Sequence, residues 1–165
     1  SQGWTGGYAT RNDNTGSVYL NCEFVVMDGE FARRKMWSLI GLHSPKGPEW
    51  ANMGRTFVKA ILNSSRGVHP GDNSPAAQNA RRISGFADLD GIEFAARIGI
   101  EKDGKGEDRN VIRLVIEPDH RDYADLMVAP RGRDDEGHGG APAASVPPYA
   151  TSRTVSAGSP PAWAQ

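Results

Sequence analysis

The stretch SVYLNCEFVVM, residues 17–27, decides the fold because its hydropathy alternates from one residue to the next. Apolar side chains occupy every second position, at Val18, Leu20, Cys22, Phe24 and Val26. Tyr19, Asn21 and Glu23 lie between them. A period of two is typical of a strand with one buried face. The pattern predicts a strand over residues 17–27 that points Tyr19 away from the core.

Two further strands are expected to flank this one. Residues 7–11 can form a short strand that leads through the polar turn 12–16, and residues 34–42 carry bulky apolar side chains. The pair Asp28-Gly29 between the second and third segments is a strong turn signal. The three segments predict an antiparallel meander.

After the third strand the apolar period changes to that of a helix. Between Pro48 and residue 66, large apolar side chains recur every three or four residues, and Gly67 suits the exit of a helix. A shorter helix is predicted over residues 75–83. Residues 92–100 and 111–116 then read as a strand hairpin.

The turn of that hairpin imitates a phosphate-binding loop. Residues 99–106, GIEKDGKG, have its glycine and lysine spacing, but Gly106 stands where Ser or Thr would ligate magnesium. A strand follows instead of a helix, so the helix N-terminus that would hold phosphate is missing. We therefore predict a plain hairpin turn.

Three strands, a helix and two strands predict a mainly β fold, a five-stranded OB-type barrel whose amphipathic helix lies between strands 3 and 4. We assign this OB-fold domain to residues 1–128. Residues 129–165 hold 8 Ala, 6 Pro, 5 Gly and 4 Ser, so they contain little to bury. They are predicted to be a flexible, disordered C-terminal tail.

Composition narrows the class of protein. The chain has 165 residues, a net charge of −1 and one cysteine, which excludes an internal disulfide. It has no apolar run near the roughly 18 residues of a membrane span and no visible secretion signal. We expect a cytoplasmic protein with no membrane partner.

Basic and aromatic residues alternate on the predicted meander, as in proteins that bind single-stranded nucleic acid. The candidate DNA-binding residues are Arg11, Tyr19, Arg33, Arg34, Lys35 and Trp37. Aromatic rings stack on bases of any sequence, and Arg and Lys neutralise phosphates. The alternatives are an ordinary surface tyrosine at Tyr19 and a second-core residue at Trp37.

Other residues offer less chemistry. The four histidines are far apart, no set of nucleophile, acid and base is visible, and we expect no enzyme activity, no metal and no cofactor. Trp163 stands alone near the C-terminus. It is a candidate docking residue for replication or recombination proteins, with an unremarkable chain end as the alternative.

The order of motifs over residues 6–116 resembles a family of phage and prophage proteins linked to single-strand DNA binding. The matching features are Gly7-Tyr8, Gly16, the strand 18–26, Asp28-Gly29 followed by the segment 33–37, Gly54 with Phe57, Leu89-Asp90-Gly91, and Asn110. The resemblance implies an OB fold and DNA binding without chemistry.

We therefore predict a sequence-tolerant single-stranded DNA-binding protein of phage or plasmid DNA replication or recombination. Self-association into a homo-oligomer is part of this prediction, since the edge strands of an open barrel invite pairing. The alternative is a non-enzymatic protein-interaction adaptor built on an OB barrel, because a fold does not fix a function.

Overall fold

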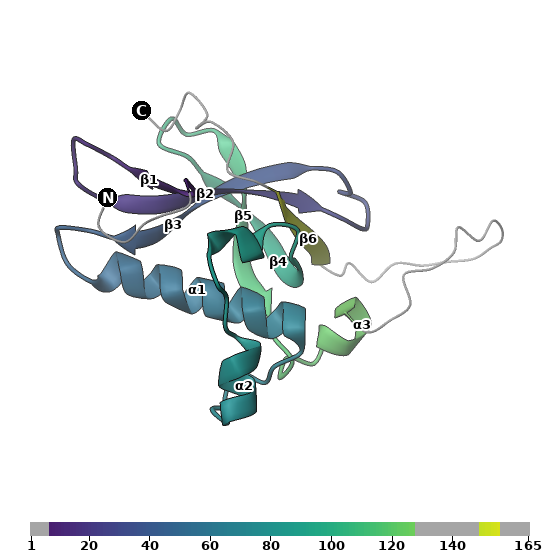
Figure 1. The fold of residues 1–165 in the computed structure, drawn as a ribbon. Coiled ribbons are helices and arrows are strands. Elements are labelled where there is room, and N and C mark those ends of the chain that lie inside the picture. Colours follow the sequence, from purple (N-terminus) through teal and green to yellow (C-terminus); the bar gives the residue numbers. More distant parts are fainter. Residues whose placement is uncertain (1–6, 128–148, 156–165) are drawn as a thin grey trace.

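A computed structural model describes residues 7–127 and 149–155 of the chain (Figure 1). The strands are β1 (Ala9–Arg11), β2 (Val18–Val26), β3 (Lys35–His43), β4 (Glu93–Lys102), β5 (Asp108–Ile116) and β6 (Tyr149–Val155). The helices are α1 (Glu49–Arg66), α2 (Pro75–Ala80) and α3 (Tyr123–Met127), and a 3-10 turn covers Phe86–Leu89. None of these helices is long and apolar enough to cross a membrane.

The strands form one antiparallel sheet. β3 pairs along one edge of β2, while β1 and β6 share the other edge, at opposite ends of β2. β6 also pairs with β4, and β4 pairs with β5. Within residues 7–127 and 149–155, β6 is thus the strand that joins the β2–β3 half of the sheet to the β4–β5 half.

Helix α1 packs across the sheet and closes the core (Figure 1). The ring of Phe24 lies edge-on to Phe57 of α1 and to Phe94 of β4, with centroid distances of 6.3 and 5.8 Å. Burial of such side chains stabilises the fold by about 1.5–3 kcal/mol each. The helix ends as predicted at Gly67, whose φ of 65° is in the left-handed region.

Two glycines let α1 approach β3 closely. A Cβ atom on Gly54 of the helix would overlap the carbonyl oxygen of Gly41 in β3. A Cβ atom on Gly41 would lie 2.5 Å from Cδ2 of Trp50. Any side chain at either position would force the helix and the strand apart.

A buried polar cluster fastens the end of α1 to the loops around it. Asn63 and Ser64 are both buried. The Asn63 amide donates to Glu117 at 2.7 Å, and its oxygen accepts from the Arg81 guanidinium at 2.6 Å. The Ser64 hydroxyl accepts from the backbone N–H of Ala95 at 3.1 Å. These bonds tie α1 to three other segments that are distant from it in the sequence.

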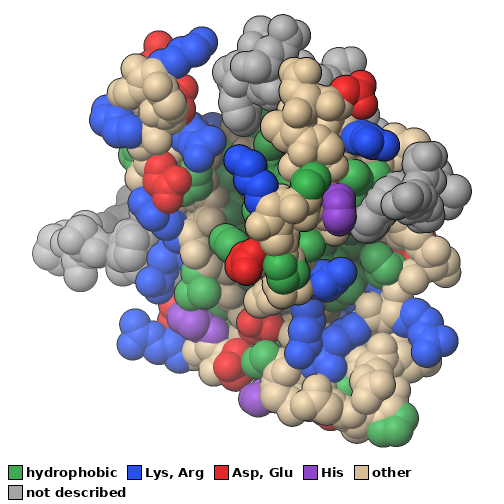
Figure 2. All heavy atoms as spheres, turned by 90° about the vertical axis from the view of Figure 1, so that its left-hand side faces the viewer, with side chains coloured by type: hydrophobic (Ala, Val, Ile, Leu, Met, Phe, Trp, Pro, Cys, Tyr) green, Lys and Arg blue, Asp and Glu red, His purple; other side chains and the backbone are tan. Residues whose placement is uncertain are grey.

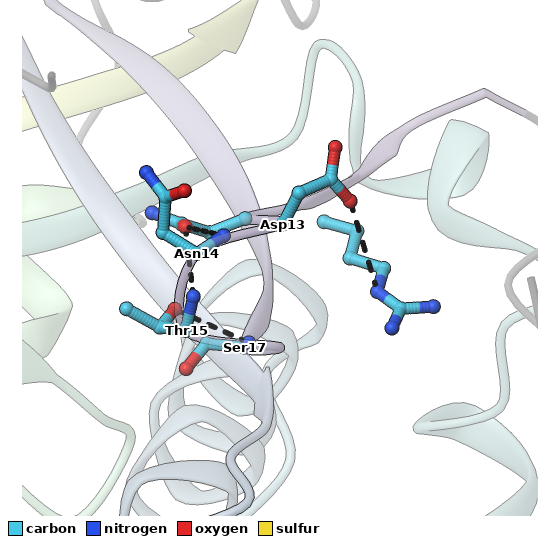
Figure 3. Close-up of polar contacts among 6 residues, drawn as sticks. Asp13, Asn14, Thr15 and Ser17 are labelled. Carbon is cyan, nitrogen blue, oxygen red and sulfur yellow. Dashed lines mark hydrogen bonds and ion pairs between the residues drawn. The ribbon is translucent and has the colours of Figure 1, made fainter.

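The structure confirms the mainly β fold, the order of three strands, helix and two strands, and the hairpin turn after residue 102. It also confirms the polar turn between β1 and β2, where the Asn12 side chain accepts from the N–H groups of Asn14 and Thr15 (Figure 3). In the hairpin turn, Asp103 accepts in the same way from Lys105 and Glu107. These N–H groups hold the pKa of Asp103 below its usual value.

Two features differ from the sequence prediction. Residues 149–155, assigned to the flexible tail, form β6; the rest of the tail, including Trp163, lies outside the described residues. In addition, no backbone ladder joins β3 to β5 in the described part of the chain. β6 lies between β2 and β4 and is the sixth strand of the sheet. The sheet is open between β3 and β5.

Candidate functional site

The open seam between β3 and β5 forms a groove on the surface. Three adjoining hollows follow the seam, of about 370, 380 and 660 Å³. β3 lines them with residues between Met36 and Gly41, and β5 with residues between Arg109 and Val115. We call these three hollows the β3–β5 groove.

Trp37 lies at the mouth of this groove. It pairs in register with Glu23 of β2, and 40% of its surface is exposed. Arg109 and Asn110 of β5 line the same hollow across the seam. The partly exposed indole therefore shares an open hollow with a guanidinium and an amide.

Tyr19 does not belong to this surface, so the prediction that it is exposed is wrong. Only 9% of Tyr19 is exposed, and its ring packs against Trp50 of α1 at a centroid distance of 6.3 Å. The cause is Gly41, which stands opposite Tyr19 in β3 and leaves room for the Trp50 indole. A bulge between Val18 and Tyr19 further disturbs the alternation on which the prediction depended.

The predicted basic residues are all exposed, and Arg34 lines the 370 Å³ hollow of the groove with Met36 and Asn110. Arg33 and Arg34 lie at the turn between β2 and β3, and the Arg34 guanidinium sits 4.5 Å above the Phe31 ring. Lys35 begins β3, two positions before Trp37. Arg11 ends β1 and lies 4.0 Å from Asp13 in the neighbouring turn (Figure 3).

Carboxylates neutralise several cations around the groove. Lys35 pairs with Glu23 at 2.9 Å, so one ion pair lies beside Trp37. Glu101 of β4 pairs with Arg113 at 2.7 Å and with Arg109 at 3.7 Å. A polyanion that binds here must displace these carboxylates from their partners.

The sequence offers Arg109 and Arg113 of β5 as a possible extension of the basic surface, with solvated charges as the alternative. It does not place them on the groove, because β3 on the other side of the seam lies more than sixty residues earlier in the chain. Gly99 is the local signal: a Cβ there would lie 2.6 Å from Cγ of Arg113, so the glycine leaves space for that side chain to cross the hairpin. Arg81 has a structural role and is not simply a solvated surface charge, since its guanidinium donates to Asn63 and to two backbone carbonyls.

The distribution of charge over the surface is mixed. On the face shown in Figure 2, Lys and Arg side chains gather along one margin and in a second group below, with acidic side chains between them. In residues 7–127 and 149–155, no group of three or more His, Cys, Asp or Glu residues could hold a metal ion.

Cys22 is an unreactive part of the core side of β2. Burial, with a smaller effect of the nearby Asp90 carboxylate, raises the pKa of its thiol to about 12. Asp90 also accepts a hydrogen bond from Tyr8, which raises the pKa of that phenol. Asp90 therefore ties the start of the chain to the loop before β4.

No protein family, curated protein or solved structure matched this chain in the comparisons.

Proposed function

We propose that this chain is a sequence-tolerant single-stranded DNA-binding protein with an OB-type β-sheet, open at the β3–β5 seam. The observation that carries the proposal is the exposed Trp37, which lines the same hollow of the groove as Arg109. Stacking on such a ring contributes about 1–3 kcal/mol per base and tolerates any base. Arg34 lines the 370 Å³ hollow of the groove, and Arg33 and Arg11 extend the phosphate contacts beyond it.

The proposed role in phage or plasmid DNA replication or recombination comes from the motif resemblance over residues 6–116. The proposed cytoplasmic location is the expectation from the composition of the sequence. The proposal needs no cofactor and no catalytic residue. Docking of replication or recombination proteins by Trp163 is a separate prediction about residues outside the described part.

The test is fluorescence anisotropy with a labelled oligothymidylate at low and at moderate salt. We expect Trp37→Ala to weaken binding by 1–3 kcal/mol, which is about a 5- to 150-fold loss of affinity. Asn79→Ala is the control, since Asn79 is exposed on α2 and lines none of the three hollows of the groove. Absence of binding by the wild-type chain at micromolar concentration and low salt would refute the proposal.

The second candidate is a protein-interaction adaptor, and exposed apolar side chains at the far end of the groove favour it. Met53 of α1 and Leu114 of β5 are 68% and 44% exposed, and both line the 660 Å³ hollow. Light scattering with and without oligonucleotide separates the two functions. A rise in the scattering mass on addition of oligonucleotide supports DNA binding, whereas an adaptor keeps the same scattering mass with and without oligonucleotide.

A further inference from the structure

Strand β6 fills a slot in the middle of the sheet. Its residues 152–155 pair with residues 23–26 of β2, and its residues 149–153 pair with residues 93–97 of β4. Both flanking strands contribute fully buried side chains beside the slot, including Phe24 and Phe94. An empty slot would leave two open strand edges at the centre of the molecule, which is a template for pairing with another strand.

The segment before β6 is long enough for the strand to enter either its own slot or the slot of a neighbouring molecule. Residues 128–148 separate the end of α3 from the start of β6, and 21 residues can span about 70 Å when extended. A neighbouring molecule's slot lies within reach of this chain length.

We infer that the slot between β2 and β4 also accepts β6 from a second copy of this chain, so that two molecules exchange their C-terminal strands. The exchanged strand makes the same backbone pairings as the resident one, so exchange costs no hydrogen bond. The balance depends on concentration, because a tether of this length holds β6 near its own slot at an effective concentration on the order of 1 mM. This inference does not depend on DNA binding.

Disulfide trapping between two single-cysteine chains tests the exchange in the full-length protein. In a Cys22→Ser background, one chain carries Val25→Cys and the other Arg153→Cys, two positions that are directly opposite in register. Neither chain can form a disulfide within itself, so a covalent heterodimer requires β6 of one copy beside β2 of the other. We expect the heterodimer to appear on oxidation and to increase with protein concentration.

The matched control replaces Arg153→Cys with Ala150→Cys. Ala150 lies in the same strand but pairs with Ala96 of β4, three positions along from the residue opposite Val25. We expect this mixture to give little heterodimer. Equal amounts in both mixtures, or none in either up to millimolar protein, would overturn the inference, because β6 would then seat only in its own chain.

A second pair of cysteine positions is needed in case Val25→Cys disturbs the fold. Glu93→Cys in β4 replaces Val25→Cys, since Glu93 is also opposite Arg153. Circular dichroism and thermal melting compare each variant with the Cys22→Ser parent. The cross-linking result is taken from the pair of variants that is folded. Oligonucleotide binding is measured on the same samples, so that loss of DNA binding and loss of exchange are seen separately.

Discussion

The close crossing of α1 over β3 can be tested by replacing Gly54 with alanine. Two effects oppose each other. Alanine in the interior of a helix is favoured over glycine by about 1 kcal/mol. The new Cβ, however, overlaps the carbonyl oxygen of Gly41, which is backbone and cannot rotate away. Overpacking of this kind costs about 1–3 kcal/mol.

The upper half of that range applies here because the whole helix must move. Trp50 sits over Gly41, and Phe57 packs against Phe24, so a shift of α1 loosens both contacts. We expect Gly54→Ala to lower the free energy of unfolding by about 1–2 kcal/mol net of the helix propensity. The corresponding fall in Tm is roughly 2–8 °C for a chain of this size.

Urea denaturation followed by circular dichroism measures this difference, with thermal melting as a second assay. Gly85→Ala is the matched control, since Gly85 is extended and no heavy atom lies within 4 Å of its added Cβ. Lys59→Ala, exposed on the same helix, should stay within about 0.5 kcal/mol of wild type. A Gly54→Ala protein more stable than wild type by about 1 kcal/mol would show that propensity alone decides, and that the helix does not approach β3 this closely.

Three further perturbations follow from the polar contacts. Glu101→Gln frees Arg109 and Arg113 from their carboxylate, so the affinity for an oligonucleotide should rise at low salt. Each freed arginine that contacts a phosphate steepens the slope of log K against log salt by about 0.7, so the slope measured by anisotropy should steepen by up to about 1.4. Cys22 has a thiol pKa of about 12 instead of 9.0, so the folded chain holds about one-thousandth of the thiolate of the unfolded chain, and iodoacetamide at pH 8 should label it only after denaturation. Labelling at equal rates in native and urea-treated protein would contradict this suppression of the thiolate. Because the folded state disfavours the thiolate, the free energy of unfolding should be insensitive to this thiol below pH 9 and should fall as the pH rises from 9 toward 12. Arg81→Met removes three donated hydrogen bonds, one of them to a buried amide, and should cost about 2 kcal/mol in urea denaturation, whereas a neutral result would mean that the loops are held by other contacts.

Much of the fold could be predicted from local sequence. The alternation over residues 17–27 gives β2, because a half-buried strand needs that period. The change of period after Pro48 gives α1, and Gly67 gives its end, since the left-handed conformation there favours glycine. Each of these signals lies within the element that it predicts.

The features that could not be predicted depend on distant partners. The burial of Tyr19 is decided by Trp50, thirty-one residues later, and only Gly41 hints at the space between them. β6 has a sequence suited to a strand, with Tyr149, two threonines and a valine, but its surroundings are rich in Ala, Pro and Gly. Composition alone favours a tail, whereas pairing to β2 and β4 supplies the ladder that makes a strand.

The ion pairs around the groove also affect how the free energy of DNA binding is divided between phosphate contacts and base stacking. A phosphate that reaches Lys35 must compete with Glu23 at 2.9 Å, and one that reaches Arg113 must compete with Glu101 at 2.7 Å. Each such contact exchanges one exposed ion pair for another, and exposed pairs contribute only about 0–1 kcal/mol. Stacking on Trp37 has no competitor of this kind, so it should dominate the affinity. The proposed function therefore requires a shallow salt dependence together with a large loss in Trp37→Ala, and a steep salt dependence with no effect of that substitution would place the nucleic acid elsewhere on the molecule.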